Sequence, residues 1–438
     1  MVSGTRSGML LLLSLTCTLN SCKKDKSAAP VIEIFMPAAG GIYHYGDTIH
    51  VKAHVHDERQ ITKLTCVLAN GNNVPFLPVT SFSTGGSQHT IDFKYVISNK
   101  LIPSGEYRLV IFASDGETDV RGYRGLTVIE MPRELWKIYL AASDNNITTS
   151  IYRTDSLLNP GFLVSFPGDF SGSAAMTSSG MFFSAGKHTG HFYALNAATE
   201  AVEWSFANCA ASGFPCYTAI DSDRERVYAG YADGRITGYD KNGIQQFSAI
   251  TNQGSYPVIL LNLENKLVAV EKPVTGGNGN IIVYSKPAGA PLFVLPAMMK
   301  IAAIERRNQD EVYVIGNDNG TAHIFLCELP SGNLSLRQQL PQTEIYDAAP
   351  INEYYMVLAT SSGLMEFDYN SNSLVPLVPG SQAVMVKYDD AGNEIYAVSG
   401  KEFFVYGYQL HTLILLNSYS LPDTIRSMEF LYNRDKFE

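Results

Sequence analysis

The chain has 438 residues and a formal net charge of −10 at pH 7, and 45% of its residues are hydrophobic, 11% aromatic and only 17% charged. Such a composition supplies a large apolar core and excludes a disordered protein. An acidic chain without a basic cluster also argues against nucleic-acid binding.

Residues 1–21 are expected to be a secretory signal peptide. Arg6 precedes the apolar run Met9–Leu15, which is too short to span a bilayer as a mature helix. The next residues, Leu19-Asn20-Ser21-Cys22, resemble a bacterial lipobox, and the sequence CKKDKS resembles the start of many Bacteroidetes lipoproteins. The alternative is an ordinary signal peptide followed by a chance cysteine.

The lipobox resemblance implies that Cys22 becomes the acylated N-terminus of the mature chain. Acyl chains would hold the protein on a membrane of the cell envelope, expected to be the outer membrane, without a transmembrane helix. Surface-export tags favour acidic residues just after the cysteine, where this chain has only Asp25. The periplasmic and the surface face therefore both stay open.

After a lipidated tether at residues 22–30, residues 31–130 are expected to form a β-sandwich. Apolar runs alternate with turn residues at the spacing of an Ig-like fold. The segments Asp57–Ile61 and Tyr107–Asp115 resemble bacterial Ig-like and cadherin-like modules. The expected strands are Val31–Phe35, Thr48–His56, Ile61–Ala69, His89–Tyr95, Gly105–Ser114 and Gly122–Ile129.

Three histidines, His50, His54 and His56, share one face of the expected strand Thr48–His56, because side chains alternate along a strand. Two of them, His54 and His56, have a spacing that some zinc sites use. An exposed polar face opposite a packed one explains the same alternation, and no third ligand is fixed by the sequence. No metal is therefore expected.

The segment Arg226–Phe247 reads as three short strands separated by tight turns. Its turns contain Asp233-Gly234 and Asn242-Gly243, which are strong hairpin signals because such turns need positive φ. The unit recurs seven times at roughly the 40–46-residue period of a four-stranded propeller blade. The second strands of the seven copies are Lys137–Ala142, Met181–Ala185, Val227–Gly230, Leu267–Val270, Val312–Ile315, Met356–Ala359 and Ile395–Val398.

Residues 134–438 are therefore predicted to form a seven-bladed β-propeller. The first copy, from Trp136, has no innermost strand before it, whereas the chain ends with the unpaired strand-like piece Ile425–Tyr432. Pairing the two would close the ring and remove a sheet edge. Six or eight blades stay open as alternatives, and the predicted fold class is all-β throughout.

One copy, Gly190–Phe206, resembles a repeat of the PQQ-like propellers, and Arg226–Phe247 resembles the same pattern with Phe247 in place of Trp. The resemblance implies a structural role for Trp204 between blades. Quinoprotein dehydrogenases of this family carry adjacent cysteines and calcium-binding carboxylates, which this chain lacks. The resemblance therefore points to non-enzymatic envelope proteins without a cofactor. The matching residues are Ala194, Leu195, Thr199, Trp204 and Phe206, while Glu200 replaces the usual Gly.

Four cysteines follow Cys22. In an oxidising envelope, Cys209 and Cys216 could form a disulfide that stiffens the loop between two blades. Cys66 and Cys327 lie in apolar strands and are expected to be buried thiols.

Candidate ligand-binding residues lie on the face formed by the loops between second and third strands and the loops into the next blade. Tyrosines and cations around a concavity suit sugar or peptide binding, although the aromatic rings could equally be packed between blades. The charged runs of the opposite face, Asp221–Arg226, Glu305–Glu311 and Asp389–Glu394, are expected to be solvated turns. The candidates are His188, Tyr217, Tyr256, Lys300, Tyr346 and Arg426.

The sequence contains no G-x-S-x-G, no H-E-x-x-H and no phosphate-binding loop, so an enzyme is not the first expectation. The favoured function is a lipoprotein that serves as a binding platform for another envelope protein. One alternative is a surface glycan-binding protein, and exposed aromatic residues would favour it. Another is a carbohydrate hydrolase or lyase, and carboxylates with raised pKa values converging in the propeller channel would favour that.

Overall fold

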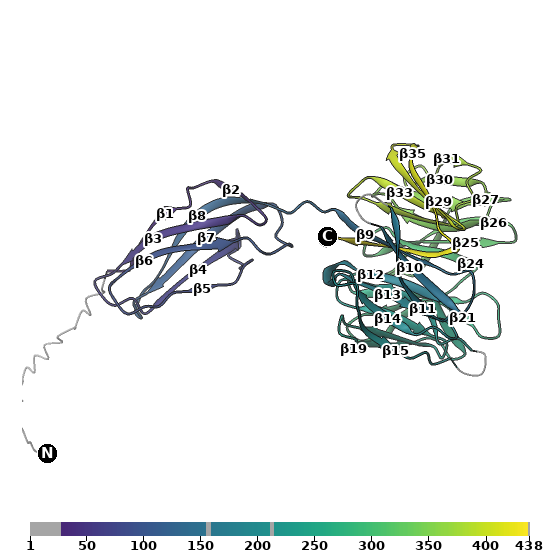
Figure 1. The fold of residues 1–438 in the computed structure, drawn as a ribbon, viewed down its shortest axis with the longest axis horizontal. Helices are drawn as coiled ribbons and strands as arrows, with labels where there is room; N and C mark the ends of the chain where they lie inside the picture. The colour runs from purple at the N-terminus through teal and green to yellow at the C-terminus, as the bar shows by residue number, and fades with distance from the viewer. Residues whose placement is uncertain (1–27, 155–158, 211–213, 437–438) are drawn as a thin grey trace, which may run out of the picture. The chain divides into compact units, whose positions relative to one another are not determined.

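The computed structural model describes residues 28–154, 159–210 and 214–436. The regular secondary structure of these residues is β-strand apart from one short 3-10 helix, η1 (Thr177–Ser179). The chain divides into two compact units, 1–131 and 132–438 (Figure 1). Within the described ranges, no helix is long and apolar enough to cross a membrane. The predicted signal peptide and Cys22 lie outside the described residues.

The first unit consists of two sheets. One has the order β1 (Val31–Met36), β3 (Thr48–His56), β6 (Gln88–Val96). The other has the order β2 (Gly41–His44), β8 (Asp119–Ile129), β7 (Gly105–Ser114), β4 (Lys63–Asn70), β5 (Thr80–Ser81). The pairing of β2 with β8 is parallel, and the other pairings are antiparallel. The short strands β2 and β5 were not among the expected ones.

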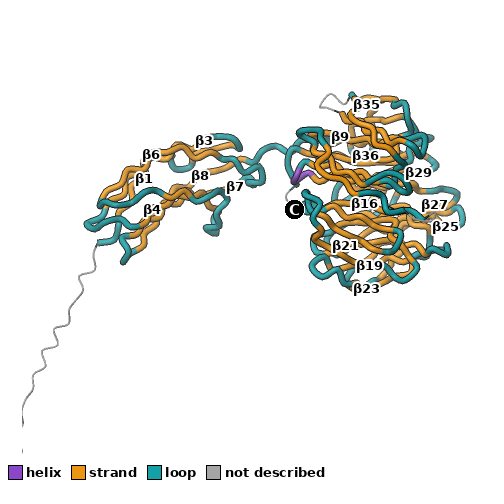
Figure 2. Tube along the Cα trace, turned by 60° about the horizontal axis from the view of Figure 1, so that its bottom comes forward, coloured by secondary structure: helices purple, strands orange, loops and turns teal. Residues whose placement is uncertain are grey.

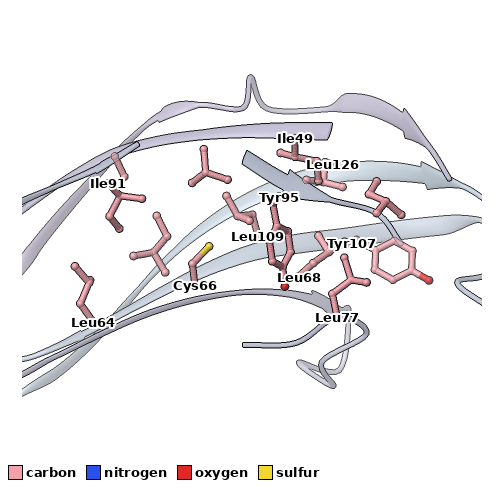
Figure 3. Close-up of a cluster of buried hydrophobic side chains, with 14 of the residues drawn as sticks. Ile49, Leu64, Cys66, Leu68, Leu77, Ile91, Tyr95, Tyr107, Leu109 and Leu126 are labelled. Carbon is pink, nitrogen blue, oxygen red and sulfur yellow. The ribbon is translucent and has the colours of Figure 1, made fainter. Parts of the chain in front are cut away.

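The core of the first unit lies between these sheets. Along β3, Ile49, Val51 and Val55 are fully buried and alternate with partly exposed polar residues, which is the two-residue period of a half-buried strand. Figure 3 shows how side chains of both sheets, among them Ile49 of β3 and Leu109 of β7, meet in this layer, where Cys66 of β4 also lies. Cys66 is a free, buried thiol.

The three histidines of β3 lie on its outer, polar face. His50 Nε2 is 2.7 Å from Asp92 Oδ1 of β6, and the rings of His54 and His56 are stacked with their centres 5.6 Å apart. In the described part of the chain, no three His, Cys, Asp or Glu side chains are placed to hold a metal ion. This face is a network of partly exposed polar contacts.

The described part of the second unit contains seven four-stranded antiparallel sheets. The first three are β36 (Ile425–Tyr432), β9 (Leu135–Ala142), β10 (Thr148–Thr154), β11 (Pro160–Pro167); β12 (Gly172–Met176), β13 (Met181–Ala185), β14 (Phe192–Asn196), β15 (Val202–Phe206); and β16 (Tyr217–Ser222), β17 (Val227–Tyr231), β18 (Arg235–Tyr239), β19 (Gln245–Ile250).

The other four sheets repeat this order. They are β20 (Ser255–Asn262), β21 (Lys266–Pro273), β22 (Asn280–Ser285), β23 (Pro291–Pro296); β24 (Lys300–Arg306), β25 (Glu311–Asp318), β26 (Thr321–Glu328), β27 (Asn333–Pro341); β28 (Ile345–Pro350), β29 (Tyr355–Thr360), β30 (Gly363–Asp368), β31 (Leu374–Pro379); and β32 (Met385–Asp389), β33 (Glu394–Ser399), β34 (Glu402–Gln409), β35 (Thr412–Ser420).

Each of the seven predicted second strands lies within the second strand of a different sheet. These strands are buried on both faces, as in β17, because neighbouring sheets pack against either side. The turn glycines Gly234 and Gly243 have φ angles of 92° and 78°, the left-handed region that favours glycine. The indole of Trp204 donates to Lys241 O at 2.9 Å, so it ties its own sheet to the next one.

The C-terminal strand completes the first sheet. β36 pairs with β9, with Ser427 opposite Ala141 and Phe430 opposite Ile138. The first strands of successive sheets are neighbours in the order β36, β12, β16, β20, β24, β28, β32. Figure 2 shows the sheets gathered around a common middle. The arrangement is consistent with a β-propeller and is all-β, as predicted.

Candidate functional site

Equivalent positions of the innermost strands carry a set of charged side chains. The strand registers place Asp221 opposite Tyr228, Glu305 opposite Tyr313, Lys387 opposite Tyr396 and Glu429 opposite Tyr139. The same position holds Ala175, Leu261 and Ala349 in the other three sheets. Charged and uncharged residues thus alternate along the order of the first strands, from Glu429 on β36 to Lys387 on β32. We call these seven residues the charged level.

An ion pair within the charged level joins the last sheet to the first. Lys387 Nζ of β32 lies 2.6 Å from Glu429 Oε2 of β36. The other Glu429 oxygen accepts a hydrogen bond from Ser173 Oγ at 3.0 Å, and Ser173 Oγ is 2.6 Å from Ser427 Oγ. The Lys387 side chain keeps 36% of its surface exposed, so water reaches this level.

Two further carboxylates are held by neighbouring strands. Asp221 Oδ2 accepts from the backbone N–H of Asn262 at 2.9 Å and from its side-chain amide at 2.8 Å. Asp347 lies two residues before the charged level on β28, where its Oδ2 accepts from Val386 N at 2.9 Å. Side chains two apart in a strand share a face, so Asp347 also lines the channel.

The surrounding protein shifts the pKa values of these groups. Burial raises the pKa of Asp221 to about 6 and that of Asp347 to about 6, and the negative charge of Glu429 contributes to both shifts. Burial and then the charge of Asp347 raise the pKa of Glu305 well above its usual range. Burial alone would lower the pKa of Lys387, but the negative charge and hydrogen bond of Glu429 raise it.

The cluster therefore combines three carboxyl groups that have raised pKa values with an ion-paired carboxylate. Such a combination can donate and accept protons. Among the described residues, no three of these carboxylates are placed to bind one metal ion.

A polar cavity of about 910 Å³ lies where the inner strands of four sheets turn into their second strands. It includes Asn262, the residue that holds Asp221, and Arg306, which follows Glu305. Its wall also contains Lys286, whose ammonium group is 2.7 Å from Asp223 Oδ2. The cavity thus lies beside the charged level.

Three residues of the charged runs that were expected to be solvated turns lie elsewhere in the structure. Asp221 and Glu305 belong to the inner strands β16 and β24 and line the channel, and the turns begin only after them. Asp389 is 2% exposed and accepts from the backbone N–H groups of Ala391 and Gly392 at 3.0 and 2.9 Å. The prediction for these three residues was wrong. In the sequence, Asp221 and Glu305 each lie two residues after an alanine, Ala219 and Ala303. This spacing places each carboxylate on the same strand face as a small residue, and it was the available signal that both carboxylates belong to strands.

Four of the six candidate ligand-binding residues lie at the opposite end of the inner strands. Tyr256 and Lys300 occupy equivalent positions in β20 and β24. Tyr346 and Arg426 are the extra residues of equivalent β-bulges in β28 and β36. Tyr346 is 39% exposed, whereas the Arg426 Nε donates to Ser143 O at 3.0 Å. These four residues therefore lie toward the same end of their inner strands.

The remaining two candidates lie elsewhere. Tyr217 is 1% exposed. Its position in β16 corresponds to that of Ile345 in β28 and of Ile425 in β36. Its ring packs 5.4 Å from that of Phe192, so it is a packed aromatic residue and is not available to a ligand. His188 is exposed in the β13–β14 loop, where its backbone N–H donates to the Asp169 carboxylate.

Cys209 and Cys216 are joined by a disulfide, with their Cα atoms 4.9 Å apart. Cys216 N donates to Lys187 O at 2.7 Å, which connects this loop to the β13–β14 loop. Cys327 is a free, buried thiol.

The outermost strand β35 presents an exposed apolar surface. Ile414, Leu415 and Leu416 follow one another and are 47%, 54% and 48% exposed, and β35 is an edge of its sheet. Most other outer strands contain Pro or a charged residue, which protect an edge from pairing. The strand β19 lacks both but is shorter and exposes mainly polar side chains. We call Ile414–Leu416 the β35 edge.

Comparisons with known proteins give structural likenesses only. No protein-family model matches the chain, and no curated protein matches it. A structure from Lactobacillus plantarum aligns over 68% of this chain and 99% of its own, with a TM-score of 0.51 and 12% identity. A quinoprotein alcohol dehydrogenase-like protein from Bacteroides thetaiotaomicron aligns over 93% of this chain and 100% of its own, with a TM-score of 0.45 and 13% identity. At these identities the likeness concerns the fold alone.

Proposed function

We propose that the protein is a lipid-anchored lipoprotein of the cell envelope whose propeller binds another envelope protein. In this proposal, Cys22 carries the acyl chains and residues 31–130 are an Ig-like spacer. The seven sheets of the second unit are the blades of one seven-bladed ring closed by β36. The observation that carries the binding function is the β35 edge.

An uncovered edge strand offers two kinds of interaction to a partner. Its outer backbone N–H and C=O groups can pair with an added strand, and its side chains can be buried by the partner. Burying three half-exposed aliphatic side chains would contribute about 2–4 kcal/mol. The strand Thr412–Ser420 has no charged residue, so the best partner is a neutral, extended segment rich in apolar residues.

The experiment is a cross-linked pull-down of the full-length lipoprotein from intact envelopes, read by mass spectrometry. Leu415→Lys puts a charge on the β35 edge, and Leu292→Lys on β23 is the matched control because both leucines are 54% exposed. We expect the wild type and Leu292→Lys to recover the same partner and Leu415→Lys to lose at least nine tenths of it. Equal recovery by all three, or no partner with the wild type, would reject the proposal.

A carbohydrate-active enzyme is the second candidate, favoured by the charged level. Glycoside hydrolysis uses one carboxyl group that holds a proton near neutral pH and one carboxylate that stays ionised. Glu305 has a strongly raised pKa, and Glu429 is ion-paired with Lys387. The cavity next to them would admit the substrate.

Incubation of the protein with a panel of envelope and plant polysaccharides, with products read by mass spectrometry, tests this candidate. Oligosaccharide release by the wild type that is abolished in Glu305→Gln would support it. The absence of release by the wild type, or unchanged release by Glu305→Gln, would reject it.

A further inference from the structure

A second cleft, of about 320 Å³, opens where the first and last sheets of the second unit meet. We call it the seam cleft. It lies among β9, the end of β10, and the turn between β32 and β33. The residues that carry the argument are Trp136, Lys137, Thr154, Asp389, Glu394 and Tyr396.

Trp136 gives the seam cleft an exposed aromatic wall. It is one of two tryptophans in the chain and is 38% exposed. Unlike Trp204, which packs among the rings of Phe183, Phe192 and Phe206, Trp136 has no ring contact among the described aromatic pairs. An indole face in a concavity is a surface on which an apolar ligand face can stack.

Thr154 contributes a hydroxyl group without a partner. It is 1% exposed, and its Oγ1 has no hydrogen-bond partner among the described residues. A buried hydroxyl without a partner is energetically unfavourable, and such groups in folded proteins usually have a partner. A hydroxyl of a bound ligand would supply it.

Carboxylates in fixed orientations complete the lining. Tyr396 donates its hydroxyl to Glu394 Oε2 at 2.5 Å, and the turn after Asp389 holds that carboxylate by two backbone N–H groups. Carboxylates held in this way have lone pairs left for ligand hydroxyl groups.

The charges around the cleft argue against an ionic ligand. Glu200 pairs with both Lys137 and Arg153, and Asp390 pairs with both Arg133 and Lys436. The lining adds the carboxylates of Asp389 and Glu394, so the charges of the two signs balance around the cleft. Lys137 Nζ also lies 4.8 Å from the centre of the Trp136 ring, where a ligand cation would otherwise bind.

We propose that the seam cleft binds a neutral saccharide of one or two sugar units. The C–H face of the sugar would stack on Trp136, one hydroxyl would pair with Thr154, and others would donate to Glu394. The volume of the cleft is at the small end of the usual range of ligand pockets, about 300–1,000 Å³, which fits a ligand of this size. The site is separate from the β35 edge and from the charged level, so it stands independently of the proposed function.

Calorimetric titration of the full chain with glucose, galactose, mannose, N-acetylglucosamine and their common disaccharides tests this inference. We expect at least one neutral sugar to bind, and Trp136→Ala to weaken its binding at least tenfold. Phe162→Ala on β11 is the control, because Phe162 is a 62% exposed aromatic residue outside the cleft.

Thr154→Val separates binding from folding. It removes a hydroxyl that has no protein partner, so the free protein should keep or gain thermal stability while sugar binding weakens several-fold. Three results would overturn the inference: no binding of any neutral sugar, unchanged binding in both cleft variants, or glucuronate binding as tightly as glucose.

Discussion

The carboxylates of the channel gain their properties from neighbours that are distant in sequence. Asp221 is held by Asn262 of the next sheet, and Asp347 by Val386 of the next sheet. These bonds stabilise the ionised form, but burial outweighs them and the pKa values rise. The residues most relevant to chemistry are therefore those whose ionised form the surrounding protein destabilises most.

The raised pKa of Asp347 predicts a pH-dependent stability. Its value of about 6 in the folded state lies above the usual 3.8, so the folded protein holds this proton more tightly than the unfolded chain. Stability should therefore fall as pH rises from about 4 to 6. We expect Asp347→Asn to raise the free energy of unfolding at pH 8 by about 3 kcal/mol, from a shift of about two pKa units, and to come close to the wild type at pH 4.

Denaturant unfolding at both pH values measures this difference. Asp318→Asn, which changes an exposed carboxylate in the same unit, is the control. A lower stability of Asp347→Asn at pH 8 would contradict the argument, because it would mean that the ionised carboxylate stabilises the fold.

At the scale of elements, the repeated inner strands share a β-bulge. Five of them skip one residue at the same place in their pairing with the second strand. The bulged residues include Tyr346 and Arg426. A bulge re-aims a side chain without ending the strand.

The closing strand β36 should be essential for the second unit. It supplies the inner strand of the first sheet, its Met428 is fully buried, and its Glu429 pairs with Lys387. Deleting residues 424–438 would expose the edge of β9 and apolar surface on two sheets.

We expect this truncated protein to lose cooperative thermal unfolding and to aggregate, as measured by calorimetry and size-exclusion chromatography. Deletion of residues 437–438 alone is the control. A soluble truncated protein with an unchanged unfolding transition would contradict the assigned role of β36.

At the scale of the whole molecule, the sequence predicts a lipid anchor ahead of two all-β units. Cys22→Ala should move the protein from the membrane fraction to the soluble fraction, because the anchor would be the acyl chains rather than a helix. Fractionation with immunoblotting measures this. Cys66→Ala, which removes a buried thiol that carries no lipid, is the control. Retention of Cys22→Ala in the membrane would disprove the lipobox interpretation.

The sequence by itself determined the all-β class, the strand periods and the position of the closing strand. These depend on local rules: alternation along β3, positive φ at Gly234 and Gly243, and an unpaired apolar segment at Ile425–Tyr432.

Only the tertiary structure decided which ionisable side chains lie close together. Asp221, Lys387 and Glu429 lie on three strands far apart in sequence, and only the packing of successive sheets brings them to one level. The seam cleft likewise exists because the first and last sheets meet there. Alternation places a side chain on one of two faces, but which face borders the channel, a neighbouring sheet or solvent is fixed by contacts across the whole ring.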